Sequence, residues 1–419
     1  MALALSAEEQ AVADGRDGPG AAMALRILAE SARLLGAERL IPIASSHIDG
    51  CLYHGDSGVA FAERLVEGGA RVAVPTTLNV GALDLMRPEQ IRLDAHERDM
   101  ALRLMRAHEA LGCRPTWTCA PYQAGHRPAP GIDVAWGESN AVAFVNSVLG
   151  ARSNRYGDFL DLCCAITGRA PATGLHLAEN RKATLLVDTS AIPDPLKALD
   201  VFYPVLGAWY GRAVGEAIGV IDGLPPDLSE DSLKAFAAAA ASSGSVALFH
   251  AAGLTPEAPD AEMALGGAPP QAILRPTPED LLAARDSLST VDSQQLDAIA
   301  VGSPHFSNSE FKQLLHLLDG RESRVPFYAC TGRHVIEQLQ AEGLLQSLET
   351  AGIRIVADTC VVVTPILEGF DGVLMTNSGK FAHYAPGNTG YGVIYGSLSD
   401  CVESAVSGRV RRDESLWSA

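Results

Sequence analysis

Apolar runs of strand length alternate with segments of helical period through most of the 419-residue chain. Helices are predicted at Ala21–Gly36 and Phe61–Gly69, each followed by a strand-like run, Leu40–Ala44 and Arg71–Val74, and a long amphipathic helix follows at Pro88–Gly112. Such alternation is typical of α/β folds whose strands are mostly parallel. The sequence therefore predicts an α/β protein with mostly parallel sheets.

Shifts in composition divide the chain into three predicted parts. The segment Gly253–Pro278 is dense in Pro, Gly and Ala, as linkers are, and a second break falls near Ala191–Pro195. We expect an N-terminal α/β subdomain at residues 1–190, a middle subdomain with its linker at 191–275, and a C-terminal α/β subdomain at 276–419.

The acidic balance of the chain excludes one class of partner. Asp and Glu number 50 against 32 Lys and Arg, which gives a formal net charge of −18. Nucleic-acid binders need basic surface that releases counterions, so we expect a small-molecule partner and no nucleic acid. The first residues lack a basic segment with a long apolar core, and the uncharged stretch Ala235–Pro256 is broken by Ser, Gly and His. We therefore expect a cytoplasmic protein that binds no membrane.

The last third of the sequence places a polar cluster after each of four predicted strands. The strands are Leu296–Val301, Val325–Ala329, Ile353–Ala357 and Gly372–Met375, with helices predicted at Glu310–Leu318 and His334–Leu348. The residues after the strands include Ser303, His305, Cys330, Cys360, Ser378 and Lys380. Open parallel sheets bind ligands at the carboxyl ends of their strands, so we expect these residues to form one site.

Motifs of several common enzyme classes are missing. The chain has no P-loop, no G-x-G-x-x-G after a strand, no H-E-x-x-H and no C-x-x-C. The sequence thus gives no support to nucleotide, nicotinamide or common zinc chemistry. In a reducing cytosol the eight cysteines are expected to be buried thiols or metal ligands rather than disulfides.

The densest group of polar residues lies between positions 116 and 158. Ser139 or Asn140 can cap the helix that follows, and the first N–H groups of that helix can bind an anion. Arg152 and Arg155 suit bidentate binding of a carboxylate or phosphate. The alternative is a capped helix followed by surface arginines that pair with nearby aspartates.

Two cysteines stand in polar strings, and four histidines, His47, His176, His250 and His305, stand in such strings or at predicted strand ends. Cys119 and Cys360 occupy loop positions where a thiolate can act, and with a third thiolate from Cys401 they could hold an iron–sulfur cluster. His47, with Asp49 and serines around it at a predicted strand end, is a candidate general base. For the remaining cysteines other than Cys330 a buried apolar role is predicted, and they are Cys51, Cys113, Cys163 and Cys164.

Seven strings taken in order resemble the large, catalytic component of aconitase X. They are Thr116–Tyr122, Trp136–Ala141, Gly150–Asp158, Thr255–Glu257, Ser303–His305, Asp358–Cys360 and Asn377–Lys380. The resemblance implies an aconitase-superfamily-like body of several α/β subdomains around a central cleft. It also implies an iron–sulfur cluster without the usual C-x-x-C motif, and a small swivelling subunit as partner.

The resemblance implies a hydro-lyase with one of two substrates. Bacterial members dehydrate cis-3-hydroxy-L-proline to Δ1-pyrroline-2-carboxylate, and archaeal members dehydrate mevalonate 5-phosphate. Archaeal sequences often place a cluster-binding Cys where Ser303 stands, so the bacterial reaction is favoured and the archaeal one is the alternative. An iron-responsive RNA-binding role, known of other aconitase relatives, is disfavoured by the net charge of −18.

The resemblance also implies roles for particular residues. The cluster ligands would be Cys119, Cys360 and Cys401, with Cys330 in reserve for Cys401, and a 2Fe–2S cluster is favoured over 4Fe–4S and 3Fe–4S. The predicted catalytic residues are His47, Lys380 and Glu138, and a serine of the small component is the alternative base. The predicted substrate-binding residues are Ser46, Asn79, Ser139, Asn140, Arg152, Ser303, His305 and Ser378.

Overall fold

The computed structural model describes residues 3–369 and 371–417. These residues form two compact units. Unit 1 contains the described residues up to Leu83 together with Leu93–Lys182, and unit 2 contains Asp84–Arg92 and the described residues from Ala183 onward. The three-part division expected from the sequence stays a prediction. No helix in the described residues is long and apolar enough to cross a membrane.

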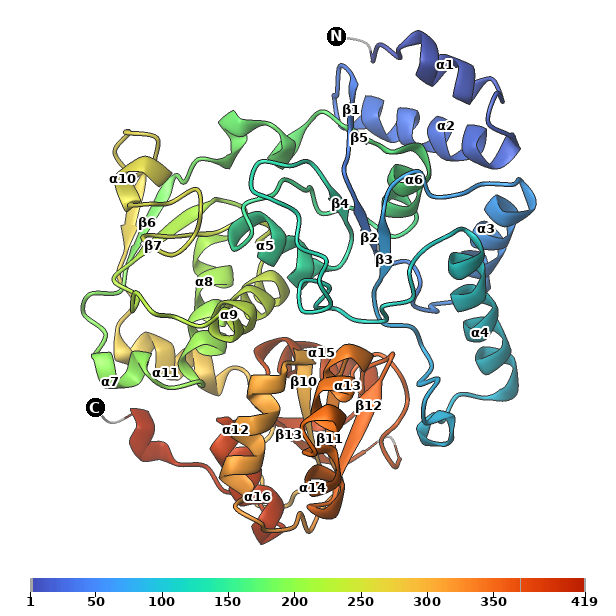
Figure 1. Ribbon diagram of the computed structural model, residues 1–419. Helices are drawn as coiled ribbons and strands as arrows, with labels where there is room; N and C mark the ends of the chain where they lie inside the picture. Colours follow the sequence, from blue (N-terminus) through green and yellow to red (C-terminus); the bar gives the residue numbers. More distant parts are fainter. Residues whose placement is uncertain (1–2, 370, 418–419) are drawn as a thin grey trace. The chain divides into compact units, whose positions relative to one another are not determined.

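Unit 1 is built on a parallel sheet of three short strands in the order β3-β2-β4 (Figure 1). These strands are β2 (Ser46–Ile48), β3 (Thr76–Leu78) and β4 (Ala135–Trp136), and an antiparallel pair is formed by β1 (Leu40–Pro42) and β5 (Arg169–Pro171). The helices are α1 (Ala7–Ala13), α2 (Pro19–Leu34), α3 (Asp56–Glu67), α4 (Ala95–Ala110), α5 (Ser139–Ser147) and α6 (Leu160–Thr167), with 3-10 turns η2 (Gly174–His176) and η3 (Ala178–Arg181). In the register, His47 lies opposite Thr77 on one side and Trp136 on the other.

Two predictions for the first third are wrong, one in the type of element and the other in its start. The strand expected at Arg71–Val74 is a loop, because its backbone N–H groups at Val72 and Ala73 donate to carbonyls at the ends of α4 and within α6 rather than to a strand. The helix expected from Pro88 begins at Ala95, where Asp94 and Glu97 form a capping box.

Unit 2 contains two parallel sheets. The first has the order β8-β7-β6-β9 and consists of β6 (Leu185–Asp188), β7 (Gly219–Asp222), β8 (His250–Ala251) and β9 (Ala272–Leu274). The second has the order β12-β11-β10-β13-β14 and consists of β10 (Ala298–Phe306), β11 (Phe327–Thr331), β12 (Ile353–Ala357), β13 (Val373–Thr376) and β14 (Gly392–Tyr395). The helices are α7 (Asp194–Lys197), α8 (Phe202–Val214), α9 (Glu230–Ser243), α10 (Ala261–Ala264), α11 (Pro278–Asp286), α12 (Asn308–Leu318), α13 (Arg333–Ala341), α14 (Leu345–Thr350), α15 (Gly379–Thr389) and α16 (Leu398–Ser407), with 3-10 turns η1 (Pro88–Gln90) and η4 (Glu414–Trp417).

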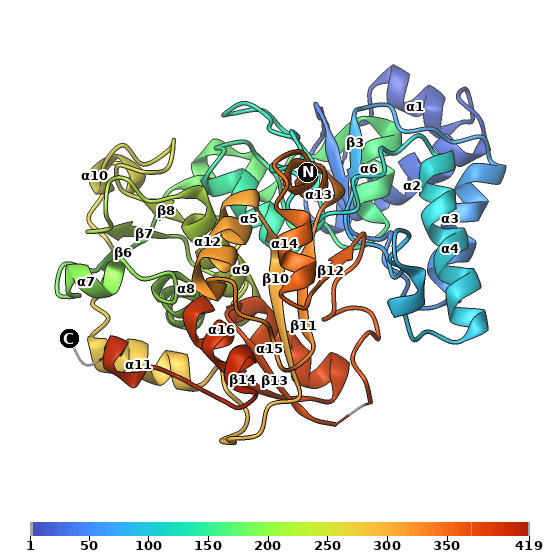
Figure 2. The same cartoon turned by 60° about the horizontal axis from the view of Figure 1, so that its bottom comes forward.

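The five-stranded sheet has the topology of an open, doubly wound sheet. Buried residues of α12, α13, α14 and α16 form one apolar core with the sheet (Figures 1 and 2), whereas α15 packs with α8 and α9. The chain therefore runs outward from β10 on one side to β12 and then on the other side to β14, which places the topological switch point between β10 and β13. The predicted α/β class with mostly parallel sheets is confirmed.

The segment Asp84–Arg92 belongs to unit 2 through its backbone and one buried carboxylate. Asp84 accepts the N–H of Ala357 at 3.1 Å, and its other oxygen accepts two N–H groups of its own turn. The next residue, Leu85, donates its N–H to Asp358 at 3.2 Å. This short segment therefore braces the end of β12.

Candidate functional site

Neighbouring parallel strands of unit 2 end in one cluster of polar side chains. The cluster comprises Ser303 and His305 on β10, Cys330 on β11, Cys360 beyond β12, and Ser378 and Lys380 at the start of α15. Strands β11, β10 and β13 lie side by side, so this cluster flanks the switch point, where open α/β sheets bind ligands. The structure thus brings these six residues together, as their positions at predicted strand ends imply.

An irregularity in β10 sets the direction of the Ser303 and His305 side chains. Ser303 and His305 lie inside β10 rather than after it, because the register with β11 shifts between Val301 and Phe306. Gly302 has φ +86°, and a Cβ there would overlap the carbonyl oxygen of Cys330. A bulge of this kind redirects the side chains that follow it, so Gly302 permits the strand to pass beside Cys330.

Cys330 and Cys360 form a hydrogen-bonded pair of buried thiols. The hydrogen bond from Cys330 is the largest effect on Cys360 and lowers the pKa of its thiol, while burial opposes the shift. The backbone N–H of Val362, the charge of Lys380 and a hydrogen bond with Ser303 lower this pKa further. These contacts favour a thiolate at Cys360, which is the form that binds metal.

The loop that carries Cys360 is held on both sides. Asp358, buried and at φ +62°, accepts two hydrogen bonds of 2.6 Å from the guanidinium of Arg333. The Nε2 of His305 lies 3.2 Å from the carbonyl oxygen of Thr359. A carbonyl only accepts, so this nitrogen carries the proton, and burial lowers the pKa of His305 to about 3. His305 therefore acts here as a neutral donor.

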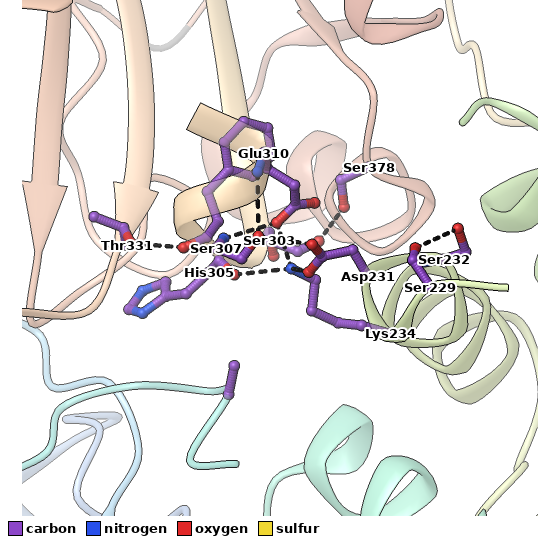
Figure 3. A network of polar contacts seen from close by, with 12 residues as sticks. Ser229, Asp231, Ser232, Lys234, Ser303, His305, Ser307, Glu310, Thr331 and Ser378 are labelled. Carbon is purple, nitrogen blue, oxygen red and sulfur yellow. Dashed lines mark hydrogen bonds and ion pairs between the residues drawn. The ribbon is translucent and has the colours of Figure 1, made fainter. Parts of the chain in front are cut away.

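A buried lysine, Lys234, contacts the end of β10 (Figure 3). Lys234 of α9 donates to Asp231 at 2.8 Å, to Glu310 of α12 and to the carbonyl oxygen of His305 at 3.3 Å. Asp231 also accepts the hydroxyl of Ser307 at 2.7 Å. Burial raises the pKa of Glu310 to about 7 against the opposing charge of Lys234. The network ties two helices to the strand that presents Ser303 and His305.

A cavity of about 270 Å³ adjoins this network. Its lining includes Lys234 and Asp231 from α9, and Ser303, Asn377 and Ser378 from the cluster side. The hydroxyl of Ser378 donates to the carbonyl of Ser303 and accepts the N–H of Phe381, so it caps α15 while it contacts β10. Ser303 and Ser378, two of the residues expected to bind substrate, therefore line this cavity.

Unit 1 holds a second group of predicted site residues around the sheet β3-β2-β4. His47 is fully buried within β2, and its Nδ1 lies 2.9 Å from the hydroxyl oxygen of Thr77. Burial, reinforced by nearby His126, holds the pKa of His47 well below its usual value. Its Nε2 has no hydrogen-bond partner in the part of the chain that the structure describes. The ring centroid lies 5.5 Å from that of Trp136.

Carboxylates gather at the end of β2. Asn79 donates to Asp49, and the backbone N–H of Asp49 donates to Asp161 at 2.7 Å. Burial raises the pKa of Asp161 to about 8 although two backbone N–H groups favour its ionised form. The hydroxyl of Ser46 donates to the carbonyl of Ala135 at 2.6 Å. Ser46 thus joins β2 to β4 through its side chain.

The start of α5 lies beside the loop of Cys119. Glu138 is the N-cap residue, since its carboxylate accepts the N–H of Ala141 at 2.6 Å, and the expectation that Ser139 or Asn140 caps this helix is wrong. The buried Asn140 instead donates to the carbonyl oxygen of Cys119 at 3.3 Å. Glutamate is an uncommon cap, and for that reason the sequence did not indicate it.

The two remaining predicted residues lie elsewhere. Cys401 is buried on α16 within the apolar core of unit 2, where burial and the charges of Asp400 and Asp200 raise the pKa of its thiol. Arg152 is half-buried in unit 1, and its Nε has no partner among the described residues. The structure therefore pairs Cys330, not Cys401, with Cys360 within unit 2.

No group of three or more His, Cys, Asp or Glu side chains among the described residues is arranged to hold a metal ion. The thiol pair of unit 2 supplies two sulfur donors, one of them with a lowered pKa, and this donor chemistry fits an iron–sulfur cluster in part. Cys119 belongs to unit 1, and its role as a ligand stays a prediction.

Sequence reasoning missed several residues that shape these groups. Thr77 and Asp161 could have been found from the sequence, because Thr77 stands in a polar string close to Asn79 and Asp161 interrupts an apolar run. His126 and Lys234 had no such signal, since each reaches its partners from a distant loop or helix.

Family models match almost the whole chain. Those described as aconitase X first domain, second domain and third domain match residues 2–179, 183–286 and 296–407. The chain is also similar to the crystal structure titled aconitase X (holo-form) from Thermococcus kodakaraensis. The TM-score is 0.87 at 34% identity, with 96% of this chain and 100% of that one covered.

Characterised relatives carry two names. The chain is 45% identical to the cis-3-hydroxy-L-proline dehydratase of Pseudomonas aeruginosa over 99% of its own length and 72% of that protein's. It is 38% identical to the protein of the same name from Hypocrea jecorina, over 97% and 69%. It is 37% identical to the phosphomevalonate dehydratase large subunit of Methanothermobacter thermautotrophicus, over 93% and 96%.

Proposed function

Because the chain belongs to the aconitase X family, we propose that it is a hydro-lyase that dehydrates cis-3-hydroxy-L-proline to Δ1-pyrroline-2-carboxylate. The observation that carries this proposal is the 45% identity to the Pseudomonas dehydratase over 99% of the chain. The convergence of Ser303, His305, Cys360 and Lys380 at one sheet edge supports it, since the family strings contribute all four.

Mevalonate 5-phosphate dehydration is the second candidate, because relatives with 33–37% identity bear that name. A phosphate monoester needs more cationic partners than an amino acid carboxylate. Within the described cluster of unit 2, the charge of Lys380 acts on Cys360, and the charge of Lys234 is balanced by Asp231 and Glu310. This charge balance favours the smaller, zwitterionic substrate.

The proposed cofactor is an iron–sulfur cluster held by Cys330 and Cys360, with Cys119 as the third predicted ligand. When bound, such a cluster supplies a Lewis acid that eases departure of the 3-hydroxyl group. Cys330 takes the place first given to Cys401, because Cys330 contacts Cys360 and Cys401 lies in the apolar core. The favoured cluster type remains 2Fe–2S.

The protein groups would then bind the substrate and move its proton. The proton α to the carboxylate is weakly acidic, so its removal needs a base and a cation beside the developing negative charge. We assign the base to Nε2 of His47 and the cation to Lys380, with Arg152 and Asn79 as further carboxylate partners. Ser303, His305 and Ser378 would orient the substrate, while Glu138 holds the start of α5.

A small subunit is the proposed protein partner. The Methanothermobacter relative is named a large subunit, and the chain spans 96% of it but only 72% of the longer Pseudomonas dehydratase. The proposed substrate-binding residues also include Ser46, Ser139 and Asn140. A serine of the small component remains the alternative base.

The test is a paired assay of the anaerobically purified chain, with and without the cognate small subunit. Each substrate is supplied separately and product is followed by NMR. Turnover of cis-3-hydroxy-L-proline without turnover of mevalonate 5-phosphate is expected. The reverse preference would overturn the proposed substrate, and full turnover by the chain alone would overturn the small-subunit base.

A further inference from the structure

Four side chains of unit 1 form a continuous hydrogen-bonded chain that ends at His47. The hydroxyl oxygen of Ser45 lies 2.8 Å from Nε2 of His126, and Nδ1 of His126 lies 2.7 Å from the hydroxyl oxygen of Thr77. That same oxygen lies 2.9 Å from Nδ1 of His47. Thr77 therefore bridges two imidazole rings through one hydroxyl group.

The number of protons on the four hydrogen-bonded side chains is fixed. Burial holds the pKa of His47 well below its usual value, and burial and Arg114 lower that of His126 to about 4, so both rings are neutral near pH 7. Each neutral ring has one N–H and one lone pair, and Thr77 has one hydrogen to donate. Thr77 can donate to one Nδ1 and must accept from the other. The two rings consequently hold opposite tautomers.

We propose that Thr77 and His126 are positioning residues that hold His47 in its Nδ1–H tautomer, so that Nε2 carries the lone pair which the proposed base requires. In this arrangement His47 donates to Thr77, Thr77 donates to His126, and Nε2–H of His126 donates to Ser45. The inference deepens the proposed function, since it rests on His47 as the base of that reaction.

The burial of Nε2 selects this direction over its reverse. If the hydrogen bonds ran in the opposite direction, His47 would carry its proton on Nε2. This atom is fully buried and has no partner among the described residues. A buried N–H without an acceptor is among the costliest polar groups to leave unsatisfied, and a bare lone pair costs less. The ring centroid of Trp136 lies 5.5 Å from that of His47, so an apolar ring packs against the imidazole.

The test uses the complete chain labelled with 15N-histidine and compares Thr77→Val, Thr77→Ser and Thr76→Val. Thr76 neighbours Thr77 on β3, but its hydroxyl donates to Val74 instead, which makes Thr76→Val a matched control. Long-range 1H–15N spectra assign the protonated nitrogen of His47, and kcat and KM for cis-3-hydroxy-L-proline are measured with the small subunit present.

We expect wild type, Thr76→Val and Thr77→Ser to show His47 protonated at Nδ1. Thr77→Val should shift the proton toward Nε2 and lower kcat about 10- to 100-fold, with KM nearly constant. An Nε2–H signal in wild type, or an unchanged His47 spectrum in Thr77→Val, would overturn the inference. If wild type has the Nδ1–H tautomer but does not turn over this substrate, the proposed function fails while the positioning role stands.

Discussion

The thiol of Cys330 hydrogen-bonds that of Cys360, and the two residues stand at the ends of adjacent parallel strands β11 and β12. Neither cysteine belongs to a motif with two cysteines close together in the sequence. The pairing of β11 with β12 in the sheet therefore brings the two thiols together. A metal site built this way depends on the strand register, because a slip of one residue turns a side chain to the opposite face.

The first prediction separates Cys330 from Cys401. Cys330→Ser and Cys360→Ser should each lower iron and acid-labile sulfide per chain after anaerobic purification, because each removes one of the paired thiols. Cys401→Ser, in the apolar core, should keep the iron content of wild type. Loss of iron in Cys401→Ser together with retention in Cys330→Ser would restore the original ligand set. Cys119→Ser in the same series tests the third ligand.

Removal of the buried lysine should destabilise unit 2. Lys234→Met leaves the carboxylates of Asp231 and Glu310 buried without their counter-ion, at a cost of about 3–5 kcal/mol in the free energy of unfolding. Lys312→Met is the control, since Lys312 is half-exposed and its pairing with Glu342 lies at the surface. Urea unfolding followed by circular dichroism measures both variants. Equal effects of the two substitutions would contradict the importance assigned to the network.

Stability should fall as pH rises from 7.5 to 8.5. The folded-state pKa of Asp161 is raised to about 8 and that of Glu310 to about 7, so folded protein binds protons that unfolded protein has already lost. This stabilisation is complete only below the unfolded pKa and disappears as pH passes through the folded pKa. The buried histidines have lowered folded-state pKa values and are half protonated only in the unfolded chain at pH 6.5, so they make stability rise with pH around that value. From pH 7.5 upward they are nearly neutral in both states, and the carboxylates set the slope.

The contribution of Asp161 can be isolated by Asp161→Asn. One group can contribute a slope of up to about 1.4 kcal/mol per pH unit, and the variant should lose that part between pH 6.5 and 8. Unfolding free energies at pH 6.5, 7.2 and 8.0 give the comparison. A slope identical to that of wild type would show that Asp161 is ionised in the folded chain throughout this range.

Glu138 should prove a capping residue rather than an acid or base. Glu138→Gln keeps an oxygen that can accept the N–H of Ala141, so kcat should stay within about tenfold of wild type. Glu138→Ala removes the cap and should cost about 1 kcal/mol of stability. A complete loss of turnover in a stably folded Glu138→Gln would instead support the catalytic role expected from the sequence.

The unit 2 cluster could be predicted because parallel βα units place strand ends at one edge. The predicted strand Ile353–Ala357 matches β12 residue for residue, and the other three strands of that prediction are present with shifted ends. Local periodicity therefore located Ser303, His305, Cys330, Cys360, Ser378 and Lys380 without knowledge of the tertiary structure. The family resemblance and the dehydratase class it implied are confirmed by the comparisons.

The remaining parts depend on contacts that no local pattern records. Cys401 and Cys330 are both buried cysteines near strand or helix boundaries, and only packing shows that one lies in the apolar core and the other beside Cys360. His126 contacts Thr77 from a loop, and Lys234 of α9 contacts Glu310 of α12. The residues of each pair are far apart in the sequence. Tertiary hydrogen bonds of this kind are set by the whole fold rather than by neighbouring residues.

The bracing of β12 by Asp84 and Leu85 determines how this protein can be dissected. A gene split near residue 183 yields a C-terminal fragment without the segment Asp84–Arg92, although that segment is part of unit 2. The N–H of Ala357 and the carboxylate of Asp358 would each lose a partner just before Cys360. Unit 2 is thus a discontinuous domain, and its thiol chemistry has to be studied in the complete chain or in a fragment to which the missing peptide is added back.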